Sequence, residues 1–448
     1  MKVLLVLVEY ETSGFKHLNL SLLSAILAKR GHERKLFDTS IYNIPVKGRV
    51  NDADVTKELL LYPPARLPST AKKSINKDVI EVFNETLKEY DPDLVAISST
   101  SVSYIIVELL LKSITTKVRP PIAIGGIHAL LCTDEIVESG LFDYICLGEG
   151  EKAIVDIMDH LAGEKASNEI ANTLVKEERT YIKNDQIPLI NDLDSLPFHD
   201  WTIYDDDYYF FRPYQGKVYR MGDFITSRGC PYTCVYCFYD RYYKFYNVNK
   251  KLRFYSPERA VTEIEDKVKR YYLSFLKMHD SDLLLRSERN SGEFIDLYAS
   301  RVGIPFACNL NANSVTKAKA KALKVGKCVS VTLGIESGSE RVRREVLKKN
   351  VSNESIAQAV ANLKEVGIRV VSNNMIGIPD ESEEEMRETL YLNRNVGVDL
   401  CETNYFYPFQ GTELGDLCYK RGYIKEVPKQ LINFRFQYFL DMPQISKE

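Results

Sequence analysis

Short apolar runs alternate with longer amphipathic stretches through the first 160 residues. Lys2 to Val8 is continuously apolar, which suits a strand covered on both faces. A helical stretch, LNLSLLSAILAK, follows and stops at Gly31. The alternation continues through DPDLVAISST, PPIAIGGIHA and FDYICLGEGE, each a strand that runs into a polar or glycine-bearing loop. This order predicts a Rossmann-like parallel sheet, whose ligands bind at the loops after the strands.

From residue 222 onward the chain repeats strand, loop and helix. Six strand-like runs occur there: DFITSRG, YLSFLKMHDSD, IPFACNLNAN, CVSVTLGIESG, RVVSNNMIGIPDE and LCETNYFYPFQGTEL. Amphipathic helices separate them, including one through SERVRREVLKK and one that begins with Ser256 as cap and Pro257 in the first turn. Six such repeats predict a partial (β/α)6 TIM-like barrel.

The chain is therefore predicted to be α/β with four parts. They are a Rossmann-like domain (1–160), a linker (161–221), a partial barrel (222–415) and a short tail (416–448). An irregular, proline-bearing excursion spans residues 43–77. Two stretches rich in Tyr and Phe, YDDDYYFFRPY and FYDRYYKFYN, flank the barrel's first strand. Aromatic side chains of this kind line a substrate tunnel, cover a flat cofactor or pack domains together, and the pattern does not choose between these roles.

Three cysteines crowd the loop after the first barrel strand. Cys230, Cys234 and Cys237 have C-x3-C-x2-C spacing, which brings three thiolates within reach of one metal centre and suits zinc or an iron–sulfur cluster. A zinc site calls for a fourth ligand at short spacing, but the next cysteine is Cys308 and the first downstream histidine is His279. A [4Fe–4S] cluster with three protein ligands is favoured, and it leaves one iron open.

Composition and charge limit the partners and the cell compartment that we expect. A net charge of -3 and a pI near 6.2 give no basic footprint, so a nucleic-acid partner is not expected. MKVLLVLVEYE is too short and too soon acidic for a signal peptide, and no apolar run approaches membrane-spanning length. Nine thinly spread cysteines fit reduced thiols, so we expect a cytoplasmic protein.

The cysteine loop, TSRGCPYTCVYCFY, resembles the signature CxxxCxΦC of the radical S-adenosylmethionine (SAM) superfamily, with Tyr236 as the aromatic residue. The resemblance implies that the open iron binds the amino and carboxylate groups of SAM. Reductive cleavage of SAM then gives a 5′-deoxyadenosyl radical, with an electron from an external donor such as flavodoxin or ferredoxin.

Several barrel phrases resemble the same superfamily in the same order: HDSDLL, LGIESGSERVRREVLKKN, NNMIGIPDE and YPFQGTEL. The resemblance implies SAM contacts at Tyr236, Asp280, Asp282, Asn311, Glu336, Ser337 and Ile376. Asn311 departs from the family, because many relatives have an arginine in that position. Each acidic residue also has a structural alternative, since Glu336 could cap a helix and the two aspartates could end a strand.

In the first domain, the succession SSTSVSY, GGIHA and LGEGE resembles the cobalamin-binding domain that precedes many radical SAM barrels. It implies cobalamin contacts at Ser98, Ser99, Tyr104, Gly125, Gly126, His128, Gly148 and Glu149. The motif D-x-H-x-x-G is missing, and His17 has a different spacing, so no histidine is expected below cobalt. The alternatives are a scaffold that has lost cobalamin, and a His128 that only caps a hydrogen-bond network.

The resemblance implies a cobalamin-dependent radical SAM enzyme that methylates an unactivated carbon, or phosphorus, of a small molecule. The alternatives are a non-methylating cyclase or rearranging enzyme and a first domain that serves for docking. A tRNA methylthiotransferase is disfavoured because the N-terminal half has only Cys132 and Cys146 in place of a cysteine triplet. The sequence assigns no substrate and no catalytic acid or base.

Overall fold

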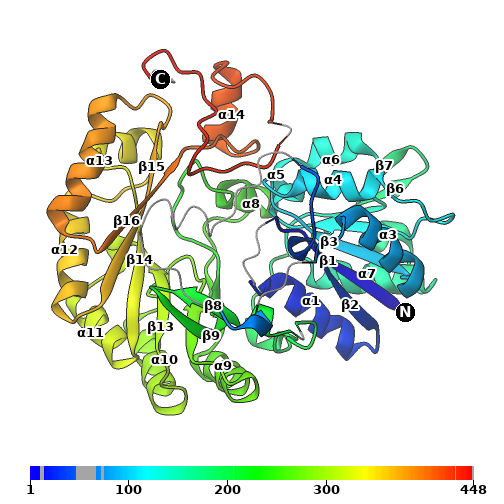
Figure 1. The fold of residues 1–448 in the computed structure, drawn as a ribbon, viewed down its shortest axis with the longest axis horizontal. Helices are drawn as coiled ribbons and strands as arrows, with labels where there is room; N and C mark the ends of the chain where they lie inside the picture. Colours follow the sequence, from blue (N-terminus) through cyan, green and yellow to red (C-terminus); the bar gives the residue numbers. More distant parts are fainter. Residues whose placement is uncertain (11–14, 47–66, 72–74, 205, 429, 446–448) are drawn as a thin grey trace.

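Two sheet-centred halves lie side by side (Figure 1), the N-terminal half in blue and cyan and the C-terminal half in green to orange. The computed structural model describes residues 1–10, 15–46, 67–71, 75–204, 206–428 and 430–445. Much of the predicted excursion, residues 47–66 and 72–74, lies outside these ranges. Among the described residues, no helix is long and apolar enough to cross a membrane.

The first sheet has the strand order β2-β1-β3-β4-β5-β6-β7. Its strands are β1 (Lys2–Leu7), β2 (Glu33–Asp38), β3 (Leu94–Ser98), β4 (Ile122–Gly125), β5 (Tyr144–Cys146), β6 (Thr173–Glu177) and β7 (Thr180–Lys183). The first five are parallel, and β6 and β7 add antiparallel strands from the stretch predicted as a linker. The parallel part of the sheet has the strand order 2-1-3-4-5, so the chain builds the sheet in one direction from β1 to β2 and in the other direction from β3 onward. Parallel sheets open a ligand crevice at such a switch point, here between β1 and β3.

In the described part of this domain, the helices that cover the two faces of the sheet are α1 (Leu18–Lys29), α3 (Val79–Tyr90), α4 (Tyr104–Lys112), α5 (Ile127–Leu131), α6 (Thr133–Ser139) and α7 (Glu151–Leu161). Side chains of β1 alternate between the faces, as a pleated strand requires. Val3 and Leu5 pack in the apolar cluster that includes Ile154 of α7, whereas Leu4 and Val6 pack in the cluster that includes Phe83 of α3. The continuous apolar run is thus explained by burial on both sides.

The second sheet has the order β16-β15-β14-β13-β12-β9-β8. Its strands are β8 (Phe211–Tyr214), β9 (Lys217–Phe224), β12 (Phe275–Met278), β13 (Phe306–Leu310), β14 (Cys328–Glu336), β15 (Arg369–Ile376) and β16 (Leu400–Tyr405). Six of them are parallel, and β8 is antiparallel to β9. The predicted partial (β/α)6 barrel is confirmed.

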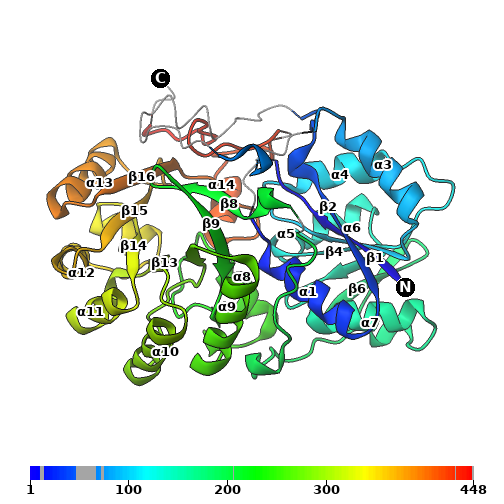
Figure 2. The ribbon, with the colours of Figure 1, turned by 60° about the horizontal axis from the view of Figure 1, so that its bottom comes forward.

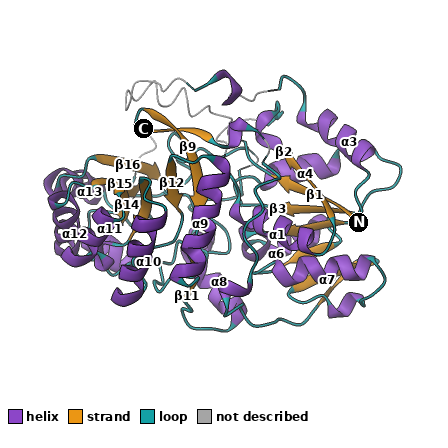
Figure 3. Cartoon of the chain, turned by 90° about the horizontal axis from the view of Figure 1, so that it is seen from below, coloured by secondary structure: helices purple, strands orange, loops and turns teal. Residues whose placement is uncertain are grey.

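Helices line the outer side of this curled sheet (Figures 2 and 3): α9 (Pro257–Tyr271), α10 (Glu288–Arg301), α11 (Lys317–Val325), α12 (Asn353–Glu365) and α13 (Glu383–Val396). The predicted start of α9 is correct, since Ser256 Oγ accepts a hydrogen bond from Arg259 N at 3.2 Å. Where a helix was expected through SERVRREVLKK, the chain instead forms a short π-helical turn, Val342–Val346.

Smaller elements complete the fold. They are α8 (Tyr239–Tyr246), α14 (Glu413–Lys420), the paired two-residue strands β10 (Ser227–Arg228) and β11 (Arg253–Phe254), and 3-10 turns at Thr39–Ile41, Ser69–Ala71, Ser167–Glu169, Leu193–Ser195, Asp207–Tyr209 and Ala312–Ser314. The part of the stretch 161–221 around Trp201 packs between the halves. Trp201 is 1% exposed there, and its ring lies 5.3 Å from Phe224 and 5.4 Å from Tyr271.

Candidate functional site: a cavity between the two sheets

A cavity of about 650 Å³ opens at the carboxyl ends of β1, β3 and β4 and reaches the loop that follows β9. This volume is typical of small-molecule and cofactor sites. Polar and glycine positions of the first domain line one part of it: Glu9, His17, Asn19, Ser98, Gly125, Gly126, Gly148, Glu149, Gly150 and Glu151. The second domain contributes Ile225, Arg228, Gly229, Phe238, Tyr239, Tyr242 and His279. The cavity therefore joins the β1/β3 crevice to the cysteine loop.

The cavity extends as an apolar slot between the first sheet and helices α1 and α7. Ala96 and Ala123 belong to the sheet face that these helices cover, and their small side chains leave space beneath the helices. Leu20 and Leu23 of α1 line the opposite wall, with Ile157 of α7. A narrow aliphatic slot of this kind suits a flat, uncharged ring.

The backbone conformation of Gly126 determines how closely two loops pack at the mouth of the cavity. Its φ is +95°, and a Cβ there would lie 2.6 Å from the carbonyl oxygen of Ser99, so only glycine fits. The close approach lets the loop after β4 pack on the loop after β3. His128 N also donates to Ser99 O at 3.2 Å. The Gly-Gly turn seen in the sequence is thus required by the packing of two loops at the cavity mouth.

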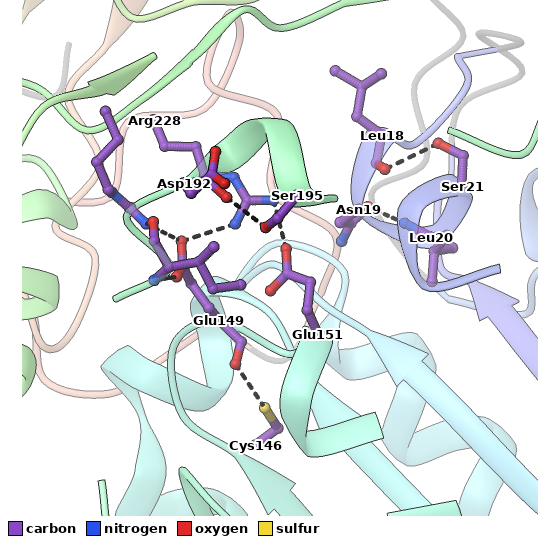
Figure 4. A network of polar contacts seen from close by, with 12 residues as sticks. Leu18, Asn19, Leu20, Ser21, Cys146, Glu149, Glu151, Asp192, Ser195 and Arg228 are labelled. Atoms are coloured by element: carbon purple, nitrogen blue, oxygen red, sulfur yellow. Dashed lines mark hydrogen bonds and ion pairs between the residues drawn. The ribbon is translucent and has the colours of Figure 1, made fainter. Parts of the chain in front are cut away.

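Glu149 connects the two domains (Figure 4). Its Oε1 accepts hydrogen bonds from Arg228 Nη1 at 2.8 Å and from Arg253 Nη1 at 2.7 Å, and its Oε2 accepts from Ile190 N at 2.9 Å. Arg228 Nη2 in turn donates to Glu151 Oε1 at 2.5 Å. Burial raises the pKa of the Glu149 carboxyl, but the Arg228 and Arg253 guanidiniums outweigh this effect and hold the pKa below its usual range. Glu149 is therefore a buried, charged bridge to the cysteine loop.

The cysteine loop itself is compact. Tyr243 Oη donates to Cys230 O at 2.8 Å and accepts from Cys230 N at 2.7 Å, while Cys237 N donates to Cys234 O at 3.0 Å. All three thiols are free and half-buried. Burial raises the pKa of the Cys230 and Cys237 thiols to about 11. Binding a metal centre would displace these protons, since the thiolate is the form that binds metals.

The carboxylates of the two aspartates predicted to contact SAM accept hydrogen bonds from backbone N–H groups. Asp280 Oδ1 accepts from Thr226 N at 3.0 Å, Thr226 Oγ1 at 2.9 Å and Ser227 Oγ at 2.5 Å, which anchors the entrance of the cysteine loop. Asp282 accepts from Leu284 N at 2.9 Å and from Asn311 N at 3.1 Å. Burial raises the pKa of both carboxyls. Both residues are 1% exposed, and their hydrogen bonds hold the backbone at the strand ends.

Of the other predicted SAM positions, Tyr236 and Glu336 lie close to the cysteines. Glu336, at the end of β14 with φ +71°, pairs with Lys349 Nζ at 3.0 Å. Burial raises the pKa of the Tyr236 phenol well above its usual value, and the charges of Glu336 and Cys234 raise it further because these groups are close. Ser337 Oγ donates to Glu381 Oε1 at 3.3 Å. Ile376 ends β15, and Asn311 caps the turn that follows β13.

The cobalamin positions predicted from sequence divide into two groups. Ser98, Gly125, Gly126, Gly148 and Glu149 line the cavity. Of the described residues, Ser99, Tyr104 and His128 are not part of its wall. The rings of Tyr104 and His128 instead lie 4.0 Å apart, and His128 is 3% exposed.

The two aromatic stretches also have different roles. Tyr208, Tyr209 and Phe210 are buried in the core between the halves. Phe238, Tyr239 and Tyr242, which follow the cysteines, line the cavity. The packing alternative therefore describes the first stretch, and the cavity-lining alternative describes the second.

Sequence reasoning missed a buried charged cluster beside the cavity. Asp223 accepts from Arg212 Nη2 at 2.7 Å, lies 2.9 Å from His279 Nε2 and lies 3.5 Å from Lys16 Nζ. Burial lowers the pKa of Lys16 to about 7, against the opposing effect of Asp223. The signal was a carboxylate inside an apolar strand, and its partners come from distant parts of the chain. His279 reaches the cavity wall from this cluster.

The residues fit the iron–sulfur cluster and the cobalamin that the motifs imply. Three half-buried thiols on one short loop supply the soft donors of an iron–sulfur cluster with an open iron. The glycine-lined mouth and apolar slot suit a large ring with a flat tail. Both sites meet the same cavity, through Gly229 next to Cys230 and through the loops of the first sheet.

Comparison with known proteins identifies both domains. The profile of the radical SAM superfamily matches residues 224–392, and that of the B12 binding domain matches residues 70–158. A cytidylyl-2-hydroxyethylphosphonate methyltransferase of Streptomyces wedmorensis is 26% identical over 91% of this chain and 78% of its own. An uncharacterized methyltransferase of Pyrococcus horikoshii is 26% identical over 73% of this chain and 70% of its own.

A solved structure and a further sequence relative are also similar to this chain. The structure of TsrM, a radical SAM methyltransferase from Kitasatospora setae, with cobalamin and a [4Fe–4S] cluster covers 94% of this chain and 75% of its own, with a TM-score of 0.67 at 15% identity. An anaerobic magnesium-protoporphyrin IX monomethyl ester cyclase of Cereibacter sphaeroides is 25% identical over 75% of this chain and 54% of its own.

The fold and site together define a metallocofactor enzyme in which a parallel sheet and a partial barrel share one cavity. The chain belongs to the radical SAM enzymes that carry an N-terminal B12-binding domain. Its cofactors are a [4Fe–4S] cluster, SAM and cobalamin.

Proposed function

We propose that this enzyme is a cobalamin-dependent methyltransferase that acts on an unactivated carbon, or phosphorus, of a small molecule. The observation that carries the proposal is the single cavity lined by the loops of the first sheet on one side and by the cysteine-loop residues Arg228, Gly229 and Tyr239 on the other. When bound, the cluster and SAM supply the radical that activates the substrate, and cobalamin supplies the methyl group.

The residues of the first domain have distinct roles in this proposal. Ser98, Gly125, Gly126 and Gly148 approach the corrin ring, and the slot between α1 and α7 takes the nucleotide tail. The aliphatic side chains of Leu20, Leu23 and Ile157 exclude water from that slot.

In the second domain, Cys230, Cys234 and Cys237 hold the cluster. SAM binds next to the cluster, against Tyr236, Glu336, Ser337 and Ile376. The strand ends around it are held in place by Asp280, Asp282 and Asn311. Phe238, Tyr239 and Tyr242 wall the substrate space and shield reactive species from water.

Further parts of the proposal concern partners and domain limits. An external one-electron donor such as flavodoxin or ferredoxin reduces the cluster, and no nucleic acid takes part. Residues 1–160 form the cobalamin-binding domain, 161–221 the linker, 222–415 the barrel and 416–448 the tail. The linker contributes its β6 and β7 to the first sheet.

A second candidate is a non-methylating cyclase, favoured by the 25% identity to the anaerobic cyclase of Cereibacter sphaeroides. To separate the two, reconstituted enzyme with cobalamin is incubated anaerobically with reductant, methyl-deuterated SAM and a small-molecule extract of its source organism. Methyl transfer gives S-adenosylhomocysteine, 5′-deoxyadenosine and a product three mass units heavier than with ordinary SAM. 5′-Deoxyadenosine without S-adenosylhomocysteine would refute methyl transfer and favour the cyclase.

A further inference from the structure

Three potential metal ligands lie together outside the cofactor cavity. They are His128 of α5, Cys132 at the junction of α5 and α6, and Glu135 of α6, and their ligand atoms all lie within 4.8 Å of one another. His128 Nε2 is 3.7 Å from Glu135 Oε2. None of the three lines the cavity wall formed by the described residues.

Local structure places the three donors on one side. Their spacing of four and three residues is that of one helical face. Cys132 itself, with φ −119° and ψ 43°, lies outside the helical region and separates α5 from α6. Hydrogen bonds of helical spacing still cross the junction, since Cys132 N donates to His128 O at 2.8 Å and Ile136 N donates to Cys132 O at 3.2 Å. The donor atoms therefore converge without any long-range contact.

The surroundings of His128 leave one of its ring nitrogens, Nε2, available to bind a metal ion. Its Nδ1 lies 3.1 Å from Ser101 Oγ, and the Tyr104 ring packs against the imidazole at 4.0 Å, so the ring is held in place. When Nδ1 donates to the serine, Nε2 carries the free lone pair. Nε2 is buried and has no hydrogen-bond partner among the described residues. A second hydrogen bond that orients a histidine in this way is typical of metal ligands.

We propose that His128 Nε2, Cys132 Sγ and a Glu135 carboxylate oxygen bind a zinc ion, with water as the fourth ligand. Imidazole, thiolate and carboxylate are all zinc ligands, at bond lengths of about 2.0–2.3 Å. A tetrahedral ion with such bonds separates a nitrogen from an oxygen donor by roughly 3.3–3.5 Å. The His128–Glu135 distance of 3.7 Å is slightly longer, and the Glu135 side chain, 44% exposed, has room to move closer.

On binding, the Cys132 thiol releases its proton to solvent and forms the zinc–sulfur bond, with no change in oxidation state. The ion would tie α5 to α6 next to the C-terminal segment. Cys132 Sγ lies 4.0 Å from the carbonyl oxygen of Gln410 in that segment. The site is separate from the cluster cysteines and from the cobalamin cavity.

The test uses the holoenzyme with its cluster and cobalamin in place, dialysed against zinc sulfate and then against buffer. Zinc is counted by mass spectrometry, and X-ray absorption at the zinc edge reads its ligands without interference from iron or cobalt. The expected result is one zinc per chain with one sulfur and one imidazole neighbour. Cys132→Ser should remove the sulfur signal, while Cys401→Ser, at an exposed cysteine, should leave zinc binding unchanged.

Two milder variants keep the test independent of folding. Glu135→Gln changes a partly exposed side chain, and Ser101→Ala removes the hydroxyl that contacts His128 Nδ1 and the Cys132 thiol. For both variants we expect a zinc affinity about 10- to 100-fold weaker, with the cluster and cobalamin retained. Zinc well below one per chain in the unmodified protein would overturn the proposal. So would a sulfur signal that survives Cys132→Ser, or more than one sulfur neighbour, because zinc would then occupy the cluster cysteines.

Discussion

Arg228 Nη1 lies 2.8 Å from Glu149 Oε1, and this contact joins the cysteine loop of the barrel to the last glycine loop of the first domain. Arg228 is two residues before Cys230, and Glu149 lies between Gly148 and Gly150 at the cavity wall. Any shift of one loop would pull on the other. Together with the Arg228–Glu151 and Arg253–Glu149 ion pairs, this contact holds the two cofactor sites at a fixed spacing.

Glu149→Ala should destabilise the enzyme strongly. Arg228 would keep its ion pair with Glu151, but the buried Arg253 guanidinium would lose its carboxylate partner. Leaving a buried charge without its partner costs about 3–5 kcal/mol. Anaerobic urea unfolding measures the loss. Glu108→Ala, which breaks a largely exposed pair with Lys112, is the control, and its effect should stay below about 1 kcal/mol. Equal effects of the two variants would contradict a bridging role for Glu149.

Cys234→Ala should abolish the cluster, because two remaining thiolates do not hold four irons in place. Iron, sulfide and the visible absorption of the reconstituted protein should fall to background. Cys401→Ala, outside the loop, should retain all three. A cluster chromophore that persists in Cys234→Ala would disprove the assignment of the three cysteines.

Gly126→Ala should lower cobalamin retention on purification. The added Cβ meets Ser99 O, and the φ of +95° is unfavourable for alanine, so the two loops at the cavity mouth must separate. Gly163→Ala is a matched control: Gly163 also has positive φ, +77°, but no heavy atom lies within 4 Å of the added Cβ. Cobalamin absorption of the purified proteins compares them, and equal retention would refute the close-packing argument.

Asp280→Asn should impair cluster assembly more than SAM affinity. The carboxylate accepts three hydrogen bonds from Thr226 and Ser227, and an amide cannot accept all of them equally well. Iron content reports the loop, and equilibrium dialysis of SAM with the remaining holoenzyme reports the cofactor. A protein with full iron content and weakened SAM binding would instead support a direct contact between Asp280 and SAM.

Stability should depend on the protonation of Glu381. Burial raises the pKa of this carboxyl from 4.5 to about 7, so the folded state binds more protons than the unfolded state between these values. Its contribution to stability is complete below pH 4.5 and is lost as pH rises to 7, by about 3 kcal/mol at most. Unfolding of Glu381→Gln should lack this fall.

Glu385→Gln provides the control for that window. Hydrogen bonding to Arg341 lowers the pKa of Glu385 to about 2, so the stability it contributes is present above pH 4.5 and is lost only at lower pH. The charge of Glu385 adds to the raised pKa of Glu381, but burial is the larger cause. The unfolding free energy of Glu385→Gln should therefore keep most of the wild-type slope between pH 4.5 and 7. A Glu381→Gln protein with the same slope as wild type would show that Glu381 is ionised in the folded state.

Local patterns were enough to predict the two sheets, the six parallel barrel strands and the start of α9. They were also enough for the cysteine loop, because three thiols within eight residues must lie close in any fold. The run SERVRREVLKK shows the limit of such patterns. It has helical periodicity, yet the buried Arg343 donates to the carbonyl oxygens of Ser337 and Val351, and the chain forms a π-helical turn there.

Contacts between distant residues required the folded chain. Asp223, Lys16 and His279 come from three separate segments, and only strand order brings them to one buried cluster. Likewise, the sequence marked Glu149 as part of a glycine loop, whereas the docking of the domains directs its carboxylate to Arg228. Periodicity and short spacings depend on neighbouring residues, so the sequence alone reveals them. Which charges meet across a cavity depends on how two domains pack, and that is decided by the tertiary structure.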